Sequence, residues 1–275
     1  KLFQWLFLLV VFFALCFAID VPETYKFIRG QAEFVKDPNQ SSYVFLGKEV
    51  RYYAFDVFWR LPPLHGWLPN AYSYAPTASG ALLAPLATKV SVYAMLRIMI
   101  TVYSIDYVLK SPSIQSTVLL LSTISILVGS FFSITQSNLR KIACYFIISE
   151  IGYMVGGAWL ANEPGLKGAI YHVVADAAMT SAFFMIIGCI VYRTGQTELK
   201  KLDGLFYKMP LTFVALIITM AALIGVPPTC GFFSKFYLIQ GAVQAGTWHF
   251  VIALLISSLI KAIILFRIIE IGYNK

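Results

Sequence analysis

The sequence predicts an all-α, polytopic membrane protein with roughly seven to nine transmembrane helices. Of its 275 residues, 59% are hydrophobic and only 12% are charged, whereas soluble domains carry roughly 45–50% apolar and about 25% charged residues. Several apolar runs reach the ~20 residues that a helix needs to cross the hydrocarbon core of a bilayer. The connections between these runs are short and contain turn residues such as Pro112 and Gly165.

The N-terminal region divides into one apolar run and a longer, more polar segment. Residues 1–19 are interpreted as a transmembrane helix, because the run is long for a signal peptide and no small-residue cleavage site follows it. Residues 20–62 form an extramembrane or interfacial segment that contains several prolines and mixed charges. Because the sequence begins with Lys1 rather than methionine, we expect it to be incomplete at its N-terminus.

The remaining sequence, residues 63–275, is expected to form one membrane domain. Its apolar runs are separated by short polar connections, which indicates a series of helical hairpins. The predicted spans run at 78–103, 114–135, 141–160, 166–192, 209–226 and 247–269, with a separate apolar piece at 230–243.

Positive charge gathers in two of the connections. One holds Arg140 and Lys141, and the other, at 193–208, holds three lysines and an arginine. The two connections share one side of the membrane if the spans between them form a hairpin, and the positive-inside rule makes that side cytoplasmic. Topology therefore explains much of the net charge of +8 better than nucleic-acid binding does.

Two proline-rich interruptions divide the apolar runs. Ala75-Pro76-Thr77 precedes Lys89, and Val226-Pro227-Pro228-Thr229 precedes Lys235. Proline frees a backbone carbonyl in a membrane helix, and this is tolerated where protein or water satisfies the carbonyl. Broken helices at matching positions of two halves are typical of inverted-repeat transporters and their ion sites. The alternative is that these prolines only kink the helices.

Charged side chains lie inside long apolar runs and predict a route for protons or cations. A charge at the centre of a bilayer costs several kcal/mol, so such residues usually face protein, an opposite charge or water. Desolvation favours the neutral form of a buried lysine, and a nearby carboxylate restores its charge. A histidine with a carboxylate about one helical turn later in the sequence can relay protons. The alternative is that the histidine only forms hydrogen bonds that hold helices together. The primary candidates for proton translocation are Lys89, Glu150, His172, Asp176 and Lys235.

Three further residues are secondary candidates: His65, Lys261 and Arg140. The chain contains no Walker loop, no GxGxxG after a strand, no HExxH and no nucleophile elbow. Its four cysteines are far apart and are interpreted as small buried hydrophobic residues. We therefore expect no metal, no cofactor and no catalytic centre in this chain, and any redox chemistry would belong to another subunit.

Three motifs carry a resemblance to a known family. They are PLHGWLPNAYSYAPTASGALLAPLATKVSVYAMLRI at 63–98, NLRKIACYFIISEIGYM at 138–154 and GVPPTCGFFSKFYL at 225–238. Together they resemble the antiporter-like subunits of Mrp-type multisubunit cation/proton antiporters, of respiratory complex I and of related hydrogenases. The resemblance extends from residue 63 to about 269, and the motifs are most similar to those of the D-type subunit of the Mrp antiporters.

The resemblance implies an inverted-repeat fold in which a broken helix of each repeat carries a key lysine. By position, Lys89 and Lys235 match these two lysines, and His172 matches a histidine that opens the intervening helix. The resemblance thus implies a proton path along the five primary candidates. It also implies partners, namely the other membrane subunits of a hetero-oligomeric complex in the bacterial cytoplasmic membrane.

The sequence departs from the family pattern at several positions. Asn138 stands where an aspartate is usual, Glu150 where histidine or glutamine is usual, and Asp176 and Thr180 where many members have histidine and lysine. The upstream run at 2–19 contains no acidic residue that could pair with Lys89, the lysine of the first broken helix. Either the chain is incomplete or rearranged at its N-terminus, or the first half-channel does not conduct.

These observations predict an ion-translocating subunit, similar to the D-type subunit of an Mrp-type Na⁺/H⁺ antiporter. One alternative is an antiporter-like proton-pumping subunit of a complex I-like NADH:quinone oxidoreductase or a membrane-bound hydrogenase. A further alternative is a structural subunit that descends from such a transporter and no longer conducts. The ions expected at the site are H⁺ and, in an Mrp-like complex, Na⁺.

Overall fold

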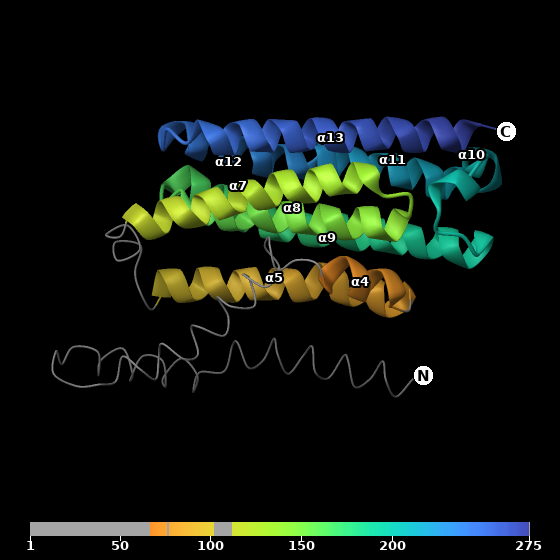
Figure 1. Ribbon diagram of the computed structural model, residues 1–275, viewed down its shortest axis with the longest axis horizontal. Coiled ribbons are helices and arrows are strands. Elements are labelled where there is room, and N and C mark those ends of the chain that lie inside the picture. The colour runs from red at the N-terminus through yellow and green to blue at the C-terminus, as the bar shows by residue number, and fades with distance from the viewer. Residues whose placement is uncertain (1–66, 76, 102–111, 275) are drawn as a thin grey trace. The chain divides into compact units, whose positions relative to one another are not determined.

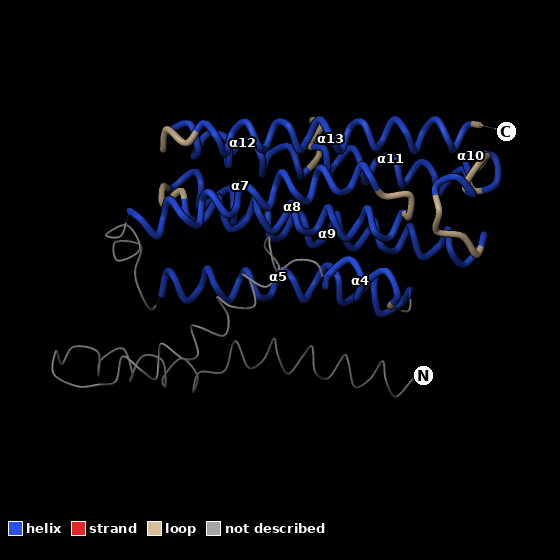
Figure 2. Tube along the Cα trace, in the orientation of Figure 1, coloured by secondary structure: helices blue, strands red, loops and turns tan. Residues whose placement is uncertain are grey.

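The computed structural model describes residues 67–75, 77–101 and 112–274. Within these residues the secondary structure is helical and contains no strand apart from one isolated β-bridge (Figure 2). The long helices run side by side as a bundle (Figure 1). The prediction of an all-α fold is therefore confirmed.

The helix order follows the predicted spans closely. Five of the described helices are long and apolar enough to cross a membrane, and α11 is a shorter apolar helix. The expected span at 1–19, the segment at 20–62 and the domain boundary between 62 and 63 lie outside the described residues. The described helices are α4 (Trp67–Tyr74), α5 (Thr77–Thr101), α7 (Pro112–Thr135), α8 (Leu139–Trp159), α9 (Glu163–Thr194), the 3-10 helix η2 (Leu199–Lys201), α10 (Leu205–Lys208), α11 (Pro210–Ile224), α12 (Cys230–Gln244) and α13 (Trp248–Tyr273).

Asparagines begin the two helices of the central hairpin. The side chain of Asn138 accepts a hydrogen bond from the backbone N–H of Arg140, and that of Asn162 accepts one from Gly165. Each asparagine thereby satisfies one of the backbone donors that the first turn of a helix leaves unpaired. Helix α9 ends at Gly195, whose positive φ of 68° suits glycine.

The basic connections meet at one end of the bundle. The backbone N–H of Leu139 donates to the carbonyl of Thr197 at 2.9 Å, and that of Leu199 donates to Ser137 at 2.8 Å. Residues Asn138 and Glu198 form the isolated antiparallel bridge between the two connections. The prediction that both basic connections lie on the same side is confirmed, because α8 and α9 form the expected hairpin.

Helix α8 lies at the centre of the bundle. Of its spanning segment 89% is buried, against 39–50% for the other four spans. Helix α7 packs closely along it, because glycines allow the two backbones to approach. A Cβ added at Gly129 would lie 2.7 Å from the backbone nitrogen of Ser149, and one at Gly152 would lie 2.9 Å from the carbonyl oxygen of Ser122. Polar side chains on α7 and α8 are consequently held close together.

Both predicted interruptions are present, and they differ in kind. Helix α4 ends at Tyr74 and α5 begins at Thr77, with Lys89 well inside α5. Helix α11 ends at Ile224 and α12 begins at Cys230, only five residues before Lys235. The second interruption therefore lies beside its lysine, whereas the first lies about 18 Å of helix away from Lys89, at a rise of 1.5 Å per residue.

Candidate functional site

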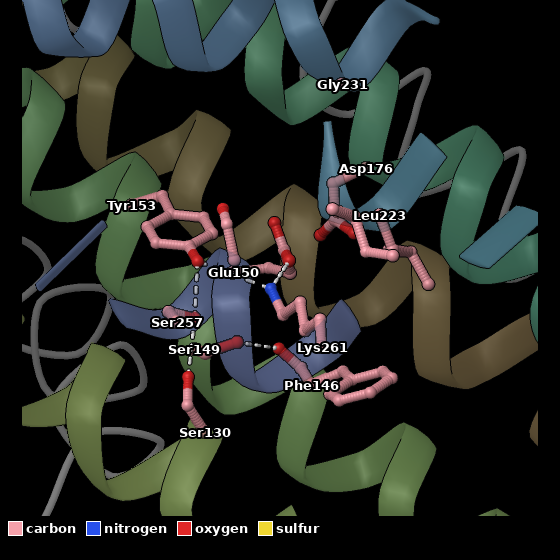
Figure 3. A network of polar contacts seen from close by, with 12 residues as sticks. Ser130, Phe146, Ser149, Glu150, Tyr153, Asp176, Leu223, Gly231, Ser257 and Lys261 are labelled. Atoms are coloured by element: carbon pink, nitrogen blue, oxygen red, sulfur yellow. Dashed lines mark hydrogen bonds and ion pairs between the residues drawn. The ribbon is translucent and has the colours of Figure 1, made fainter. Parts of the chain in front are cut away.

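The five primary candidates and one secondary candidate are buried in the helix bundle. None of these six side chains has more than 6% of its surface exposed, and they come from α5, α8, α9, α12 and α13. Figure 3 shows part of this network around α8. The buried set is Lys89, Glu150, His172, Asp176, Lys235 and Lys261.

Lys89 of α5 forms an ion pair with Asp176 of α9. The Nζ atom of Lys89 lies 2.6 Å from Oδ2 of Asp176, and both side chains are buried. The hydroxyl of Thr180, one turn further along α9, donates to the other carboxylate oxygen at 2.6 Å. The carboxylate that accompanies Lys89 thus comes from a helix downstream of it in the sequence.

Glu150 of α8 joins two other helices. Its Oε2 atom lies 2.6 Å from Nε2 of His172 on α9, and its Oε1 atom accepts a hydrogen bond from Nζ of Lys261 on α13. The sequence contains no charged residue near Glu150 on the same helix, and the structure supplies both of its partners from other helices. Lys261, a secondary candidate, is thus a direct partner of Glu150.

His172 connects this pair to α12. Its Nδ1 atom lies 2.8 Å from the hydroxyl oxygen of Ser234, and that hydroxyl also donates to the carbonyl of Gly231 at 3.0 Å. A cationic imidazole donates from both nitrogens, and the hydroxyl then donates to Gly231. A neutral imidazole can keep its Nε2–H on Glu150 and accept from the rotated hydroxyl. Both charge states of His172 therefore find partners without any heavy atom moving.

Lys235 occupies the break between α11 and α12. Its Nζ atom donates to the carbonyls of Leu223 at 2.7 Å and Ile224 at 3.0 Å, and to the hydroxyl of Ser258 on α13 at 3.1 Å. In a continuous helix, those two carbonyls would accept from the residues four positions later. These residues are Pro227 and Pro228, which have no N–H to donate. The double proline thus supplies the lysine with its acceptors.

The cluster holds more cationic groups than carboxylates. It contains three lysines and one histidine against two acids. Lys89 pairs with Asp176 and Lys261 with Glu150, while the oxygens around Lys235 are uncharged. A proton added at Lys235 is therefore not fully balanced, and Coulomb repulsion couples its charge to that of Lys261, which lies over the same Tyr153 ring.

His172 and Asp176 share a face of α9 but contact different partners. His172 bonds to Glu150 and Asp176 to Lys89, so the two form parallel contacts rather than a direct His–Asp pair. Sequence reasoning missed the hydroxyl groups of Tyr153, Ser234 and Ser257 at this site. In the sequence, each of these residues stands within one helical turn of a charged candidate: Tyr153 of Glu150, Ser234 of Lys235 and Ser257 of Lys261. That proximity was the only sequence feature that pointed to them.

Another secondary candidate lies outside this cluster. Arg140, at the start of α8, donates to the backbone carbonyls of Ser73 and Ala75 at 3.3 and 3.2 Å and so binds the end of α4. His65 lies outside the described residues.

No group of three potential metal ligands occurs among the residues that the structure describes. The described cysteines are unpaired, with Cys144 buried, Cys230 half-buried and Cys189 exposed. The expectation that every cysteine is buried is therefore wrong for Cys189, which lies on the outer face of α9.

Comparison with protein families places this geometry in context. The family model described as NADH:quinone oxidoreductase/Mrp antiporter, transmembrane, matches residues 3–261. NADH-quinone oxidoreductase subunit N of Desulforudis audaxviator is 40% identical over 213 residues, covering 78% of this chain and 42% of that protein. The antiporter subunit mnhD2 of Staphylococcus aureus is 36% identical over 203 residues, covering 74% and 40% respectively. The chain thus spans less than half the length of these relatives.

A shorter stretch matches a different protein. Over 69 residues, 25% of this chain, the sequence is 83% identical to the trimethylamine N-oxide transport system permease protein TmoV of Pelagibacter ubique. That match covers 10% of TmoV.

Solved structures show the same fold. A chain of the Mrp complex from Dietzia sp. aligns with a TM-score of 0.77 and 26% identity, covering 86% of this chain and 43% of that one. A chain of respiratory complex I from Thermus thermophilus aligns with a TM-score of 0.73 and 25% identity, covering 86% and 50%.

Proposed function

Because this chain belongs to the NADH:quinone oxidoreductase/Mrp antiporter membrane family, we propose that it carries protons across the membrane as one subunit of a larger complex. It is an integral membrane, antiporter-like subunit. The proposed setting is the cytoplasmic membrane of a bacterium, with other membrane subunits as partners. The observation that carries the proposal is the buried cluster of titratable side chains around α8 and α9.

The proposed path runs through the buried groups of this cluster. Lys235 holds a proton at the α11–α12 break and gives it up when positive charge rises nearby. His172 and Glu150 exchange protons through their 2.6 Å contact, and Lys261 shares Glu150. Asp176 and Lys89 form the next pair, one turn along α9. Each step moves a proton between groups that are buried, so bulk water does not compete for it.

The experiment uses the assembled complex in proteoliposomes with a pH-sensitive dye inside. Lys235→Ala should abolish coupled proton transport, because the carbonyls of Leu223 and Ile224 would then face no proton carrier. Lys201→Ala is the matched control, since Lys201 is an exposed lysine paired with Glu198 on the surface. Proton transport at the normal rate in the Lys235→Ala complex would contradict the proposal.

Two driving forces remain as candidates, and each has support. The alignment with the Mrp complex, at a TM-score of 0.77, favours exchange of protons for Na⁺, with this chain in the position of the D-type antiporter subunit. The 40% identity to NADH-quinone oxidoreductase subunit N favours a redox-driven proton pump. We propose the Mrp-type exchange first. Mass spectrometry of co-purified proteins discriminates, because small antiporter subunits would indicate exchange and iron–sulfur subunits would indicate a redox pump.

The third alternative is a structural subunit that no longer conducts. The paired charges in the described residues count against it, since buried ions are costly to retain and apolar residues of similar size would pack as well. If the complex with Lys235→Ala transports protons as fast as the complex with Lys201→Ala, the structural, non-conducting alternative is favoured.

A further inference from the structure

A chain of hydroxyl groups leads away from the Glu150–Lys261 pair towards α7. Nζ of Lys261 donates to the hydroxyl of Tyr153 at 3.4 Å, and the Tyr153 hydroxyl lies 2.6 Å from that of Ser257. The Ser257 hydroxyl lies 2.5 Å from that of Ser130. We call Tyr153, Ser257 and Ser130 the hydroxyl branch; Figure 3 shows it descending from Tyr153 of α8 through α13 to α7. All three side chains are fully buried.

We propose that the hydroxyl branch conducts protons to Lys261 from the end of the bundle that carries the basic connections, an inference that rests on the proposed function. Tyr153, Ser257 and Ser130 would thus be proton carriers, in addition to the charged residues of the cluster. The branch approaches Lys261 from the side of α7. The ring of its first member, Tyr153, also contacts the site, with its centroid 5.4 Å from that of the His172 ring and 5.1 Å from Nζ of Lys235.

The hydrogen atoms of the branch can be counted. Ser130 has one hydroxyl hydrogen and two acceptors, the carbonyl of Ile126 at 2.7 Å and the hydroxyl of Ser257. When Lys261 is an ammonium ion it can only donate, so Tyr153 accepts from it and donates to Ser257. Ser257 then donates to Ser130, and Ser130 donates to the carbonyl of Ile126. Every buried hydroxyl has both a donor and an acceptor role in this arrangement.

The opposite arrangement reverses these three contacts. When Lys261 is a neutral amine, its lone pair accepts from Tyr153, Tyr153 accepts from Ser257, and Ser257 accepts from Ser130. A proton that reaches the Ser130 oxygen then shifts each hydroxyl hydrogen by one position. Three O–H bonds break, three form, and one N–H bond forms on Lys261. The result is the first arrangement, so the two hydrogen-bond patterns are the states before and after one proton transfer.

The branch points towards the basic end of the bundle. Ser130 lies about 8 Å from the end of α7 at Thr135, at a rise of 1.5 Å per residue. Ser133, one turn closer to that end, is also fully buried on the same face, and its hydroxyl donates to the backbone carbonyl of Ser130 rather than to the hydroxyl branch. The connection after α7 leads directly to Asn138 and Arg140, where the two basic connections meet. By the positive-inside rule that end faces the cytoplasm, so the branch would take up protons from the cytoplasmic side.

Neighbouring serines on α13 separate this route from the Lys235 site. Ser257 contacts Tyr153 and Ser130, whereas Ser258 accepts from Lys235. The two hydroxyls therefore serve different lysines, and a change at Ser257 tests the branch without removing a partner of Lys235.

The test measures proton uptake per mole of assembled complex in proteoliposomes, driven by a potassium–valinomycin potential. We expect Ser257→Ala and Tyr153→Phe each to slow uptake at least about tenfold, because each removes a hydroxyl from a buried hydrogen-bonded chain. Ser257→Thr should restore most of the rate, since threonine keeps the hydroxyl. Ser122→Ala is the matched control: Ser122 is a buried serine of α7 whose hydroxyl donates to its own helix, at the carbonyl of Val118.

The outcomes separate this inference from the proposed function. Uptake lost in Lys235→Ala but normal in Ser257→Ala and Tyr153→Phe would overturn the branch and leave the proposed function intact. Normal uptake in Lys235→Ala would overturn the proposed function itself. A fall in total uptake in Ser257→Ala that lower complex content fully explains would show a packing role and would overturn the branch. An equal fall per mole of complex in Ser122→Ala would overturn it too. A larger solvent deuterium isotope effect on uptake in Ser257→Ala than in the unmodified complex, with normal complex content, would support it.

Discussion

At the scale of single residues, Glu150 is the most consequential side chain of the cluster. It is fully buried and accepts hydrogen bonds from His172 on α9 and Lys261 on α13. Removing one partner of a buried ion pair leaves a charge uncompensated, whereas removing both can be nearly neutral. The same carboxylate therefore holds three helices together and takes part in the proposed proton path.

A double-mutant cycle tests this dual role. We expect Glu150→Gln to destabilise the protein by about 3–5 kcal/mol, because Lys261 keeps its charge in a buried position without a carboxylate. Adding Lys261→Met should recover most of that loss in the free energy of unfolding while transport stays abolished. Unfolding of the purified protein in detergent, followed by circular dichroism, measures the effect. Glu163→Gln is the control, since Glu163 pairs with Lys167 on the exposed surface and its loss should leave unfolding unchanged.

Ser234 gives a second test at this scale. Its hydroxyl supplies the partner of His172 Nδ1 in both charge states. Ser234→Ala leaves a buried nitrogen unsatisfied, at a cost of about 1–3 kcal/mol, and should slow transport several-fold without removing any charged group. Ser149→Ala is the control, because the Ser149 hydroxyl is equally buried and donates to the carbonyl of Phe146 in its own helix. Equal rates in the two variants would contradict a role for Ser234.

At the scale of elements, the break between α11 and α12 is the feature that gives Lys235 its environment. Ile224 ends α11, Gly225 follows with a φ of 91°, and Cys230 begins α12. The carbonyls exposed by Pro227 and Pro228 lie at the C-terminal end of α11, where the helix dipole is negative. A lysine can thus be held in a buried position by uncharged oxygens.

Restoring the missing N–H groups should disable this element. With Pro227→Ala and Pro228→Ala together, the carbonyls of Leu223 and Ile224 regain possible partners within the helix, and Lys235 loses its acceptors. We expect transport to fall at least about tenfold, measured in proteoliposomes, with complex assembly retained. Pro210→Ala is the control, because Pro210 stands in the first turn of α11, where no N–H is needed. Transport that survives the double substitution would show that the break is not what activates Lys235.

At the scale of the whole molecule, the arrangement of the connections sets the orientation in the membrane. The connections at 136–138 and 195–209 lie together at the basic end. The connection at 160–162 lies at the other end of α8 and contacts α12, where the side-chain amide of Asn162 donates to the carbonyl of Gly241 at 2.6 Å. One end of the bundle is therefore strongly basic, and the other carries the Glu163–Lys167 pair.

Cysteine labelling tests this orientation. In a background without native cysteines, Lys201→Cys should react with a membrane-impermeant maleimide only in inverted vesicles, and Glu163→Cys only in right-side-out cells. Both side chains are more than half exposed, so accessibility is set by sidedness alone. The reverse pattern would place the basic end outside and would also reverse the direction proposed for the hydroxyl branch.

The amino-acid sequence determined the helices and the charged residues of the cluster. Apolar runs of membrane length and proline-marked breaks are local properties, which is why the spans at 114–135 and 141–160 and the break before Lys235 were predicted correctly. The buried charged residues could also be identified from the sequence, because a charged residue stands out within a run of apolar ones.

Which of these residues contact one another depends on how the helices pack. Glu150 pairs with Lys261, which is distant in the sequence, and Asp176 turns to Lys89 rather than to His172 on its own helix. Ser130, Ser257 and Tyr153 resemble ordinary small or aromatic residues of membrane helices until three helices bring their hydroxyls within hydrogen-bonding distance. Contacts between helices depend on the rotation and approach of each helix, and these are set by packing over the whole bundle rather than by any local pattern.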